Sequence, residues 1–100
     1  MTEEEAKAAL SDCRTRIDTV DRRLVALLNE RTRVVEQIGK IKQQMAMPIY
    51  EPKREDEVFA NATSANSGPL SPEAVKRIFE RIIDEMRVVQ KTKMEKGTQC

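Results

Sequence analysis

The chain has 100 residues, of which 39% are hydrophobic and 35% charged, and its formal net charge is +1. This composition is typical of one small, helix-rich domain, and the near-neutral charge argues against nucleic-acid binding, which needs a basic face. Because the chain has no His and only two Cys, we expect neither a zinc site nor acid–base chemistry by imidazole. Only 3% of the residues are aromatic, so the core must be aliphatic, which favours helix-on-helix packing.

Residues from about 3 to 45 favour one long helix, because this stretch lacks Pro, contains Gly39 as its one glycine and is rich in good helix formers. Apolar residues recur there in alternating steps of three and four, which places them on one helix face. Arg31 interrupts this stripe. The stripe consists of Leu10, Cys13, Ile17, Val20, Leu24, Leu27, Arg31, Val34, Ile38, Ile41 and Met45.

The length of this helix predicts a dimer. At 1.5 Å per residue it is a rod of about 60 Å, whereas a compact domain of this size has a radius of gyration of about 13 Å. One chain cannot cover such a rod, so we expect an all-α homodimer whose first helices pack along the stripe.

Two shorter helices should follow. Pro48 disfavours helix before it, and Pro52 suits the first turn of a second helix that ends near Ala62. A loop rich in Ser, Asn and Gly covers residues 63–69, and Ser71 should cap a third helix that frays after about Lys93. We therefore predict one domain over residues 1–100, with frayed tails at 1–9 and 91–100.

Arg31, the charged residue within the apolar stripe, indicates an anion-binding site. A buried, unpaired guanidinium costs several kcal/mol, so Arg31 needs a carboxylate partner or an anionic ligand. Lys42 lies eleven residues later, which leaves about 20° of rotation and about 16 Å of rise, so it shares the face of Arg31. Arg14 cannot reach this site on its own helix, but in an antiparallel dimer it could approach the middle of the partner's helix.

Further polar residues come from the other two helices. Arg54 and Glu55 begin the second helix, at a turn that can overhang the first. Gln90 lies four residues after Met86 on the third, near its apolar face, where its amide can donate a hydrogen bond without titrating. Taken singly, Arg31, Lys42 and Gln90 are also consistent with ordinary solvated positions, so these residues suggest a small-anion site and name no reaction.

The order and spacing of five segments resemble the all-helical (type II) chorismate mutase family over residues 10–90. Each segment alone is weak, and together they are a strong match. The segments are RTRID at 14–18, LVALLNER at 24–31, IGKIK at 38–42, PIYEPKRE at 48–55 and the stretch from Phe79 to Gln90.

The resemblance implies a fold, a reaction and residue roles. It implies an intertwined homodimer, three helices per chain, and rearrangement of chorismate to prephenate, toward phenylalanine and tyrosine, without metal or cofactor. By resemblance, the substrate carboxylates would bind arginines, one of them from the partner subunit, and the breaking ether bond would be met by a lysine and a glutamine. The implied residues are Arg14 from the partner, Arg31 and Arg54 for the carboxylates, Lys42 and Gln90 for the ether oxygen, and Glu51 and Glu55 for the ring hydroxyl.

Two departures from the family pattern concern this site. Met86 stands where relatives often carry a small hydroxyl residue that would contact a carboxylate, and Glu51 is longer than the Asp of some relatives. Other functions stay open: an isochorismate pyruvate lyase-like enzyme, against which Glu55 argues, and a non-catalytic helical dimer or regulatory module. Whether a partner synthase activates the chain is also open. With no signal peptide or apolar span in the sequence, we expect a cytoplasmic protein bound to no membrane.

Overall fold

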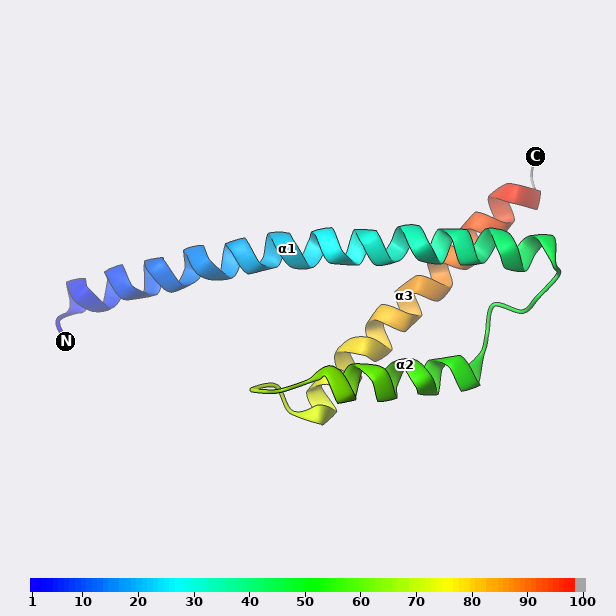
Figure 1. Cartoon of the computed structure of the whole chain (residues 1–100). Coiled ribbons are helices and arrows are strands. Elements are labelled where there is room, and N and C mark those ends of the chain that lie inside the picture. Colours follow the sequence, from blue (N-terminus) through cyan, green and yellow to red (C-terminus); the bar gives the residue numbers. More distant parts are fainter. Residues whose placement is uncertain (99–100) are drawn as a thin grey trace. The chain divides into compact units, whose positions relative to one another are not determined.

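The computed structural model describes the backbone of residues 1–98 and the side chains of residues 1–92. It contains α1 (Glu3–Gln44), α2 (Pro52–Ala65) and α3 (Pro72–Thr98), and no strand occurs among the described residues (Figure 1). The predicted all-α chain with a long first, a short second and a medium third helix is confirmed. Among the described residues, none of these helices is long and apolar enough to cross a membrane.

The first helix begins and ends with recognisable capping motifs. Thr2 accepts a hydrogen bond from the backbone N–H of Glu5 at 3.1 Å and donates one to the Glu5 carboxylate at 3.0 Å, so Thr2 is the N-cap of the helix. At the other end Ala46 adopts a left-handed φ of 53°. The N–H of Met47 bonds to the carbonyl of Lys42 at 2.8 Å, and this pattern is a Schellman motif.

The other two helices start as the sequence indicates. Pro52 opens α2, and the Ser71 hydroxyl accepts a hydrogen bond from the N–H of Ala74 at 3.1 Å, so the predicted cap of α3 is confirmed. The second helix runs three residues beyond the predicted end, to Ala65, and its C-cap is Asn66. The side chain of Asn66 then bonds within the loop, to the carbonyl of Leu70 at 2.8 Å.

The segments predicted to fray are helical from Glu3 and up to Thr98. Sequence reasoning missed the N-cap at Thr2, which satisfies an N–H of the first turn and so favours helix there. How far these ends fray in solution stays a prediction, as does the single domain over 1–100, and residues 99 and 100 lie outside the described part of the chain.

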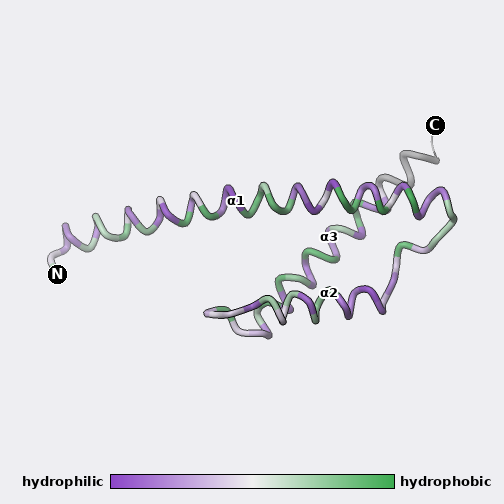
Figure 2. The backbone as a smooth tube through the Cα atoms, in the orientation of Figure 1, coloured by the Kyte–Doolittle hydropathy of each residue, from purple (hydrophilic) through white to green (hydrophobic). Residues whose placement is uncertain are grey.

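The chain divides into two compact units, Met1–Arg33 and the part from Val34 onward. The first unit is the N-terminal part of α1, and its aliphatic stripe is exposed: Ile17 is 57% and Leu27 61% accessible. Figure 2 shows hydrophobic residues recurring along α1. Nothing within a single helix can bury its own side chains, so this unit has no core of its own.

The second unit holds the buried residues. Val35 from α1 and Val75, Ile83 and Met86 from α3 are its buried apolar side chains, and α2 packs against α3. Gly39 of α1 is also buried. A methyl group built on Gly39 would lie 3.5 Å from the Cα of Gln90, so the absence of a side chain lets the backbones of α1 and α3 approach closely.

Candidate active site

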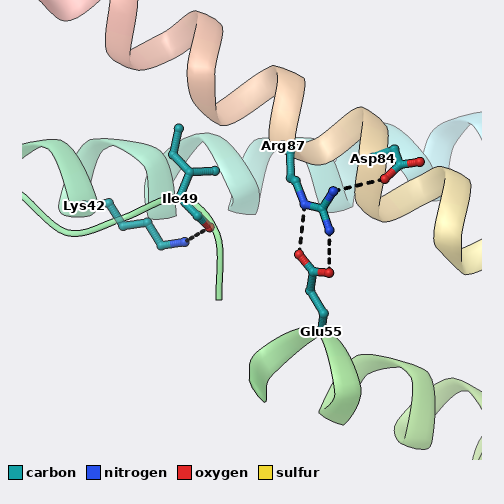
Figure 3. Close-up of polar contacts among 5 residues, drawn as sticks. All are labelled: Lys42, Ile49, Glu55, Asp84 and Arg87. Atoms are coloured by element: carbon teal, nitrogen blue, oxygen red, sulfur yellow. Dashed lines mark hydrogen bonds and ion pairs between the residues drawn. The ribbon is translucent and has the colours of Figure 1, made fainter. Parts of the chain in front are cut away.

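Lys42 is the one buried charged residue among the described side chains, at 7% exposure. Its Nζ donates a hydrogen bond to the carbonyl of Ile49 at 3.0 Å (Figure 3) and lies 3.3 Å from Oε1 of Glu51. Both acceptors belong to the loop that follows α1, and the left-handed turn at Ala46 directs this loop back toward the helix. An ammonium group has three donors, so these two contacts leave one N–H for a ligand.

Gln90 of α3 lies opposite Gly39 of α1. Gly39 precedes Lys42 by about one helical turn. The stem of Gln90 is close to the position that a Cβ of Gly39 would occupy, with Cγ at 3.7 Å. The side-chain oxygen of Gln90 is buried and has no hydrogen-bond partner. A buried polar atom without a partner costs about 1–3 kcal/mol, and such an atom calls for a functional explanation. A 180° rotation of the amide would present its NH₂ group, which can donate.

Glu55, at the start of α2, is held by Arg87 of α3 (Figure 3). Arg87 Nε donates to Oε2 of Glu55 at 2.9 Å, and Nη2 donates to Oε1. The Glu55 side chain is 19% exposed. This two-point geometry is the strong form of an arginine–carboxylate pair, and it fixes the carboxylate of Glu55 in one orientation.

Two more groups surround the guanidinium of Arg87. Nη1 donates to Oδ1 of Asp84 at 3.2 Å, and the ring of Tyr50 lies 5.3 Å from the guanidinium carbon, within cation–π range. The hydrogen bonds to Glu55 and, to a smaller extent, the negative charge of Asp84 raise the pKa of Arg87 above its usual value. Arg87 therefore stays charged at every working pH.

The remaining predicted residues of the second unit lie at different depths. Arg54 is exposed and pairs along α2 with Glu57 at 3.4 Å, and the side chain of Glu51 is 46% exposed beside Lys42. Met86 is buried on α3. The structure thus brings Lys42 and Glu51 together, and it leaves the guanidinium of Arg54 at the surface.

The other two predicted arginines belong to the first unit. Arg14 is exposed, and Arg31 is half-buried with interactions to neighbouring groups. Their position relative to Lys42 stays a prediction, and so do the ligand-binding roles of all the predicted site residues.

Sequence reasoning missed Arg87. A signal was present, because Arg87 precedes Gln90 by three residues and so lies on nearly the same face of the third helix. Its partner Glu55 is 32 residues away in the chain, and no helical periodicity connects residues on different helices.

The second unit therefore combines a buried ammonium group, a buried amide and an oriented carboxylate. Such groups bind and orient a polar ligand and stabilise a developing negative charge. No cluster of three or more His, Cys, Asp or Glu side chains with the geometry to hold a metal occurs in the part of the chain that the structure describes.

Comparison with known proteins connects this arrangement to a family. A family model described as chorismate mutase type II matches residues 13–91. The chain is 37% identical over 78 residues to the bifunctional chorismate mutase/prephenate dehydratase of Neisseria gonorrhoeae, an alignment that covers 78% of this chain and 21% of the relative. The chain thus spans about a fifth of the length of the curated relatives of this kind.

Solved structures match over nearly their whole length. A chorismate mutase of Thermus thermophilus is 32% identical, with a TM-score of 0.81 and coverage of 83% of this chain and 94% of that chain. The chorismate mutase of Helicobacter pylori in complex with prephenate is 28% identical, also with a TM-score of 0.81, and coverage is 88% and 96%. The resemblance predicted from the sequence motifs is confirmed, and the chain belongs to the chorismate mutase type II family.

Proposed function

We propose that this chain converts chorismate to prephenate, on the route to phenylalanine and tyrosine, without metal or cofactor. The observation that carries the proposal is the buried ammonium of Lys42, held by Ile49 and Glu51 with one donor left over. Burial of a cation is costly unless a buried anion pairs with it, and the carboxylate of Glu51 is 46% exposed. A binding site for an anionic substrate would account for the buried charge of Lys42.

The reaction needs no nucleophile and no proton relay. It is a unimolecular rearrangement, so the enzyme has to hold the substrate in a compact geometry and stabilise the charge that grows on the ether oxygen. A rate gain of about a millionfold corresponds to about 8 kcal/mol. Lys42 and the rotated amide of Gln90 would donate to that oxygen. Lys42 follows Gly39 by three residues on α1, and Gln90 of α3 packs against Gly39.

The carboxylates of the substrate would meet the arginines. Arg31 and Arg54 would bind them from one chain and Arg14 from the partner subunit, since a guanidinium can bind a carboxylate at two points. Glu51 and Glu55 would engage the ring hydroxyl, and Glu51 also orients Lys42 through the contact at 3.3 Å. Met86, which is buried, would line the site without donating a hydrogen bond.

The homodimer is part of the same proposal. In the first unit the stripe residues Leu10, Val20 and Leu24 are each 51% exposed, and patches of exposed aliphatic surface mark interaction sites. A second copy of α1 offers the same stripe, as a two-fold interface requires. A cytoplasmic location stays a prediction from the sequence, which leaves the question of a partner synthase open.

The loss of chorismate absorbance with purified protein tests the activity. The product should be prephenate, and Arg31→Ala should abolish its formation while leaving the helix content intact. Pyruvate released from isochorismate would instead indicate a lyase. A folded dimer without turnover on either substrate would contradict an enzymatic role.

Subunit mixing tests the contribution of Arg14 across the interface. In the proposed composite site, Arg14 comes from one subunit and Lys42 from the other. A homodimer of Arg14→Ala or of Lys42→Met therefore has both sites damaged and should be inactive. Random pairing makes half of the dimers mixed, and each mixed dimer has one intact site, so about a quarter of wild-type activity should return. No recovery in confirmed mixed dimers would place Arg14 in the site of its own chain or outside it.

A further inference from the structure

The pair of Arg87 and Glu55 differs from the surface ion pairs on the same helices. Arg54 with Glu57 and Arg81 with Glu85 are neighbours within one helix, and Arg81 is 77% exposed. Arg87 instead joins α3 to the start of α2, and the side chains of Arg87 and Glu55 are 39% and 19% exposed. A partly buried pair with two-point geometry is held far more firmly than an exposed pair within a helix.

Arg87 is itself held on three sides. Glu55 takes Nε and Nη2, Asp84 takes Nη1, and the ring of Tyr50 lies against the guanidinium. Figure 3 shows the contacts from Glu55 of α2 and Asp84 of α3, and Tyr50 belongs to the loop before α2. Because the guanidinium is planar and cannot turn without breaking several contacts, it acts as a rigid support for the carboxylate.

This support decides what Glu55 can do. A carboxylate paired with a guanidinium is ionised, so it accepts hydrogen bonds and cannot donate them. Each oxygen has two lone pairs, and one of them points to Arg87. One lone pair on each oxygen remains, in a fixed direction, for an O–H or N–H group.

We propose that Arg87 is a positioning residue that holds Glu55 as a fixed hydrogen-bond acceptor for the ring hydroxyl of the substrate. This inference rests on the proposed function, because it assigns a role within the same site. The predicted contact of Glu55 with the ring hydroxyl then depends on Arg87, which does not itself touch the substrate. Lys at this position would keep the charge and lose the planar two-point grip.

A pair of substrates separates this role from a general structural one. The probe is the chorismate analogue in which hydrogen replaces the ring hydroxyl, assayed beside chorismate. A hydrogen bond to a charged group corresponds to a preference of about 10- to 100-fold, so the wild type should favour chorismate in kcat/KM by that factor. Arg87→Met should reduce the preference to within about threefold of that of Glu55→Gln, because a released carboxylate no longer points at the hydroxyl.

The controls use the same helix and the same chemistry. Arg81→Met removes an exposed arginine from α3 and should leave the preference unchanged. Arg87→Lys should give an intermediate preference, and it keeps the test possible where Arg87→Met does not fold. An Arg87 variant that loses activity equally on both substrates would show a structural role only and would overturn the proposal.

A second readout does not depend on turnover. The Nε–H signal of Arg87 in nitrogen-15 NMR should be sharp and shifted by its bond to Glu55, and it should collapse toward the free arginine position in Glu55→Gln. A free-arginine signal in the wild type overturns the positioning role even in an active enzyme. A shifted signal in a protein that turns over neither substrate contradicts the proposed function and leaves the Arg87–Glu55 support standing as a structural feature.

Discussion

Replacement of Lys42 by Met is the most direct test of the buried cation. Met keeps the length and the apolar stem of Lys and removes the ammonium group, including the bond to the Ile49 carbonyl at 3.0 Å. Loss of one preorganised donor to a developing oxyanion costs about 10²–10³ in kcat, or about 2.7–4 kcal/mol. We expect a loss in that range for Lys42→Met.

The same substitution has a separate effect on stability. The Ile49 carbonyl loses its donor, which costs about 1–3 kcal/mol if the carbonyl stays dry. Glu51 is 46% exposed and is solvated by water instead, so it adds little. Burial of a methionine side chain offsets part of the loss, and we expect the free energy of unfolding to fall by about 1 kcal/mol.

Stopped-flow or steady-state absorbance at saturating chorismate gives kcat, and urea unfolding at fixed protein concentration gives the stability. Lys40→Met is the matched control, because Lys40 lies two residues earlier on α1 and is exposed. A Lys42→Met enzyme whose kcat stays within tenfold of the wild type, with Lys40→Met unaffected, would refute the electrostatic role of Lys42.

Substitutions at three further positions test other parts of the site and its scaffold. Gln90→Glu should shift activity toward acid, because only the protonated carboxyl can donate to the ether oxygen, whereas wild-type turnover should vary little across neutral pH; an unchanged pH–rate profile removes Gln90 from that role. Ala46→Gly should raise the free energy of unfolding by about 0.5–1 kcal/mol in urea titrations, because a left-handed φ costs a residue with a Cβ about 1–2 kcal/mol and the added freedom of the unfolded chain offsets part of the gain; a loss of stability would contradict the αL cap. Gly39→Ala should be neutral or should raise the free energy of unfolding by up to about 1 kcal/mol, because the new Cβ would lie at ordinary contact distances of 3.5–3.8 Å from Gln90. Gly39→Val should lower the free energy of unfolding by about 1–3 kcal/mol and should lower activity by displacing Gln90. Equal stability and activity of the two variants would show that α1 and α3 do not approach closely at Gly39.

Local signals in the sequence predicted the fold well. Pro52 and Ser71 each act on the helix that follows them, and the starts of α2 and α3 follow from these two residues. The absence of Pro before Met45 allows the first helix to continue without a break. The end of α2 was predicted too early, at Ala62, because a cluster of small polar residues marks a loop only on average and the chain stays helical until Asn66.

The candidate site was predictable only in part. The helical face that Lys42 occupies follows from periodicity, but its burial depends on a loop that the turn at Ala46 directs back toward α1. The support from Arg87 depends on the packing of α2 on α3, and one sequence contains no record of which residues meet across helices. Helix position and the family motifs both singled out Glu55 and Gln90, and neither supplied the partner of Glu55.

The position of the exposed aliphatic stripe within the chain has a consequence for protein synthesis. The stripe ends at Met45, so it emerges from the ribosome before α2 and α3 do, and N-terminal segments fold first during synthesis. In the proposed dimer, two growing chains on one messenger RNA could pair through their first helices before the loop that holds Lys42 has emerged from either ribosome. Association would then precede the folding of each chain's own core, which is the reverse of the usual order for two finished subunits.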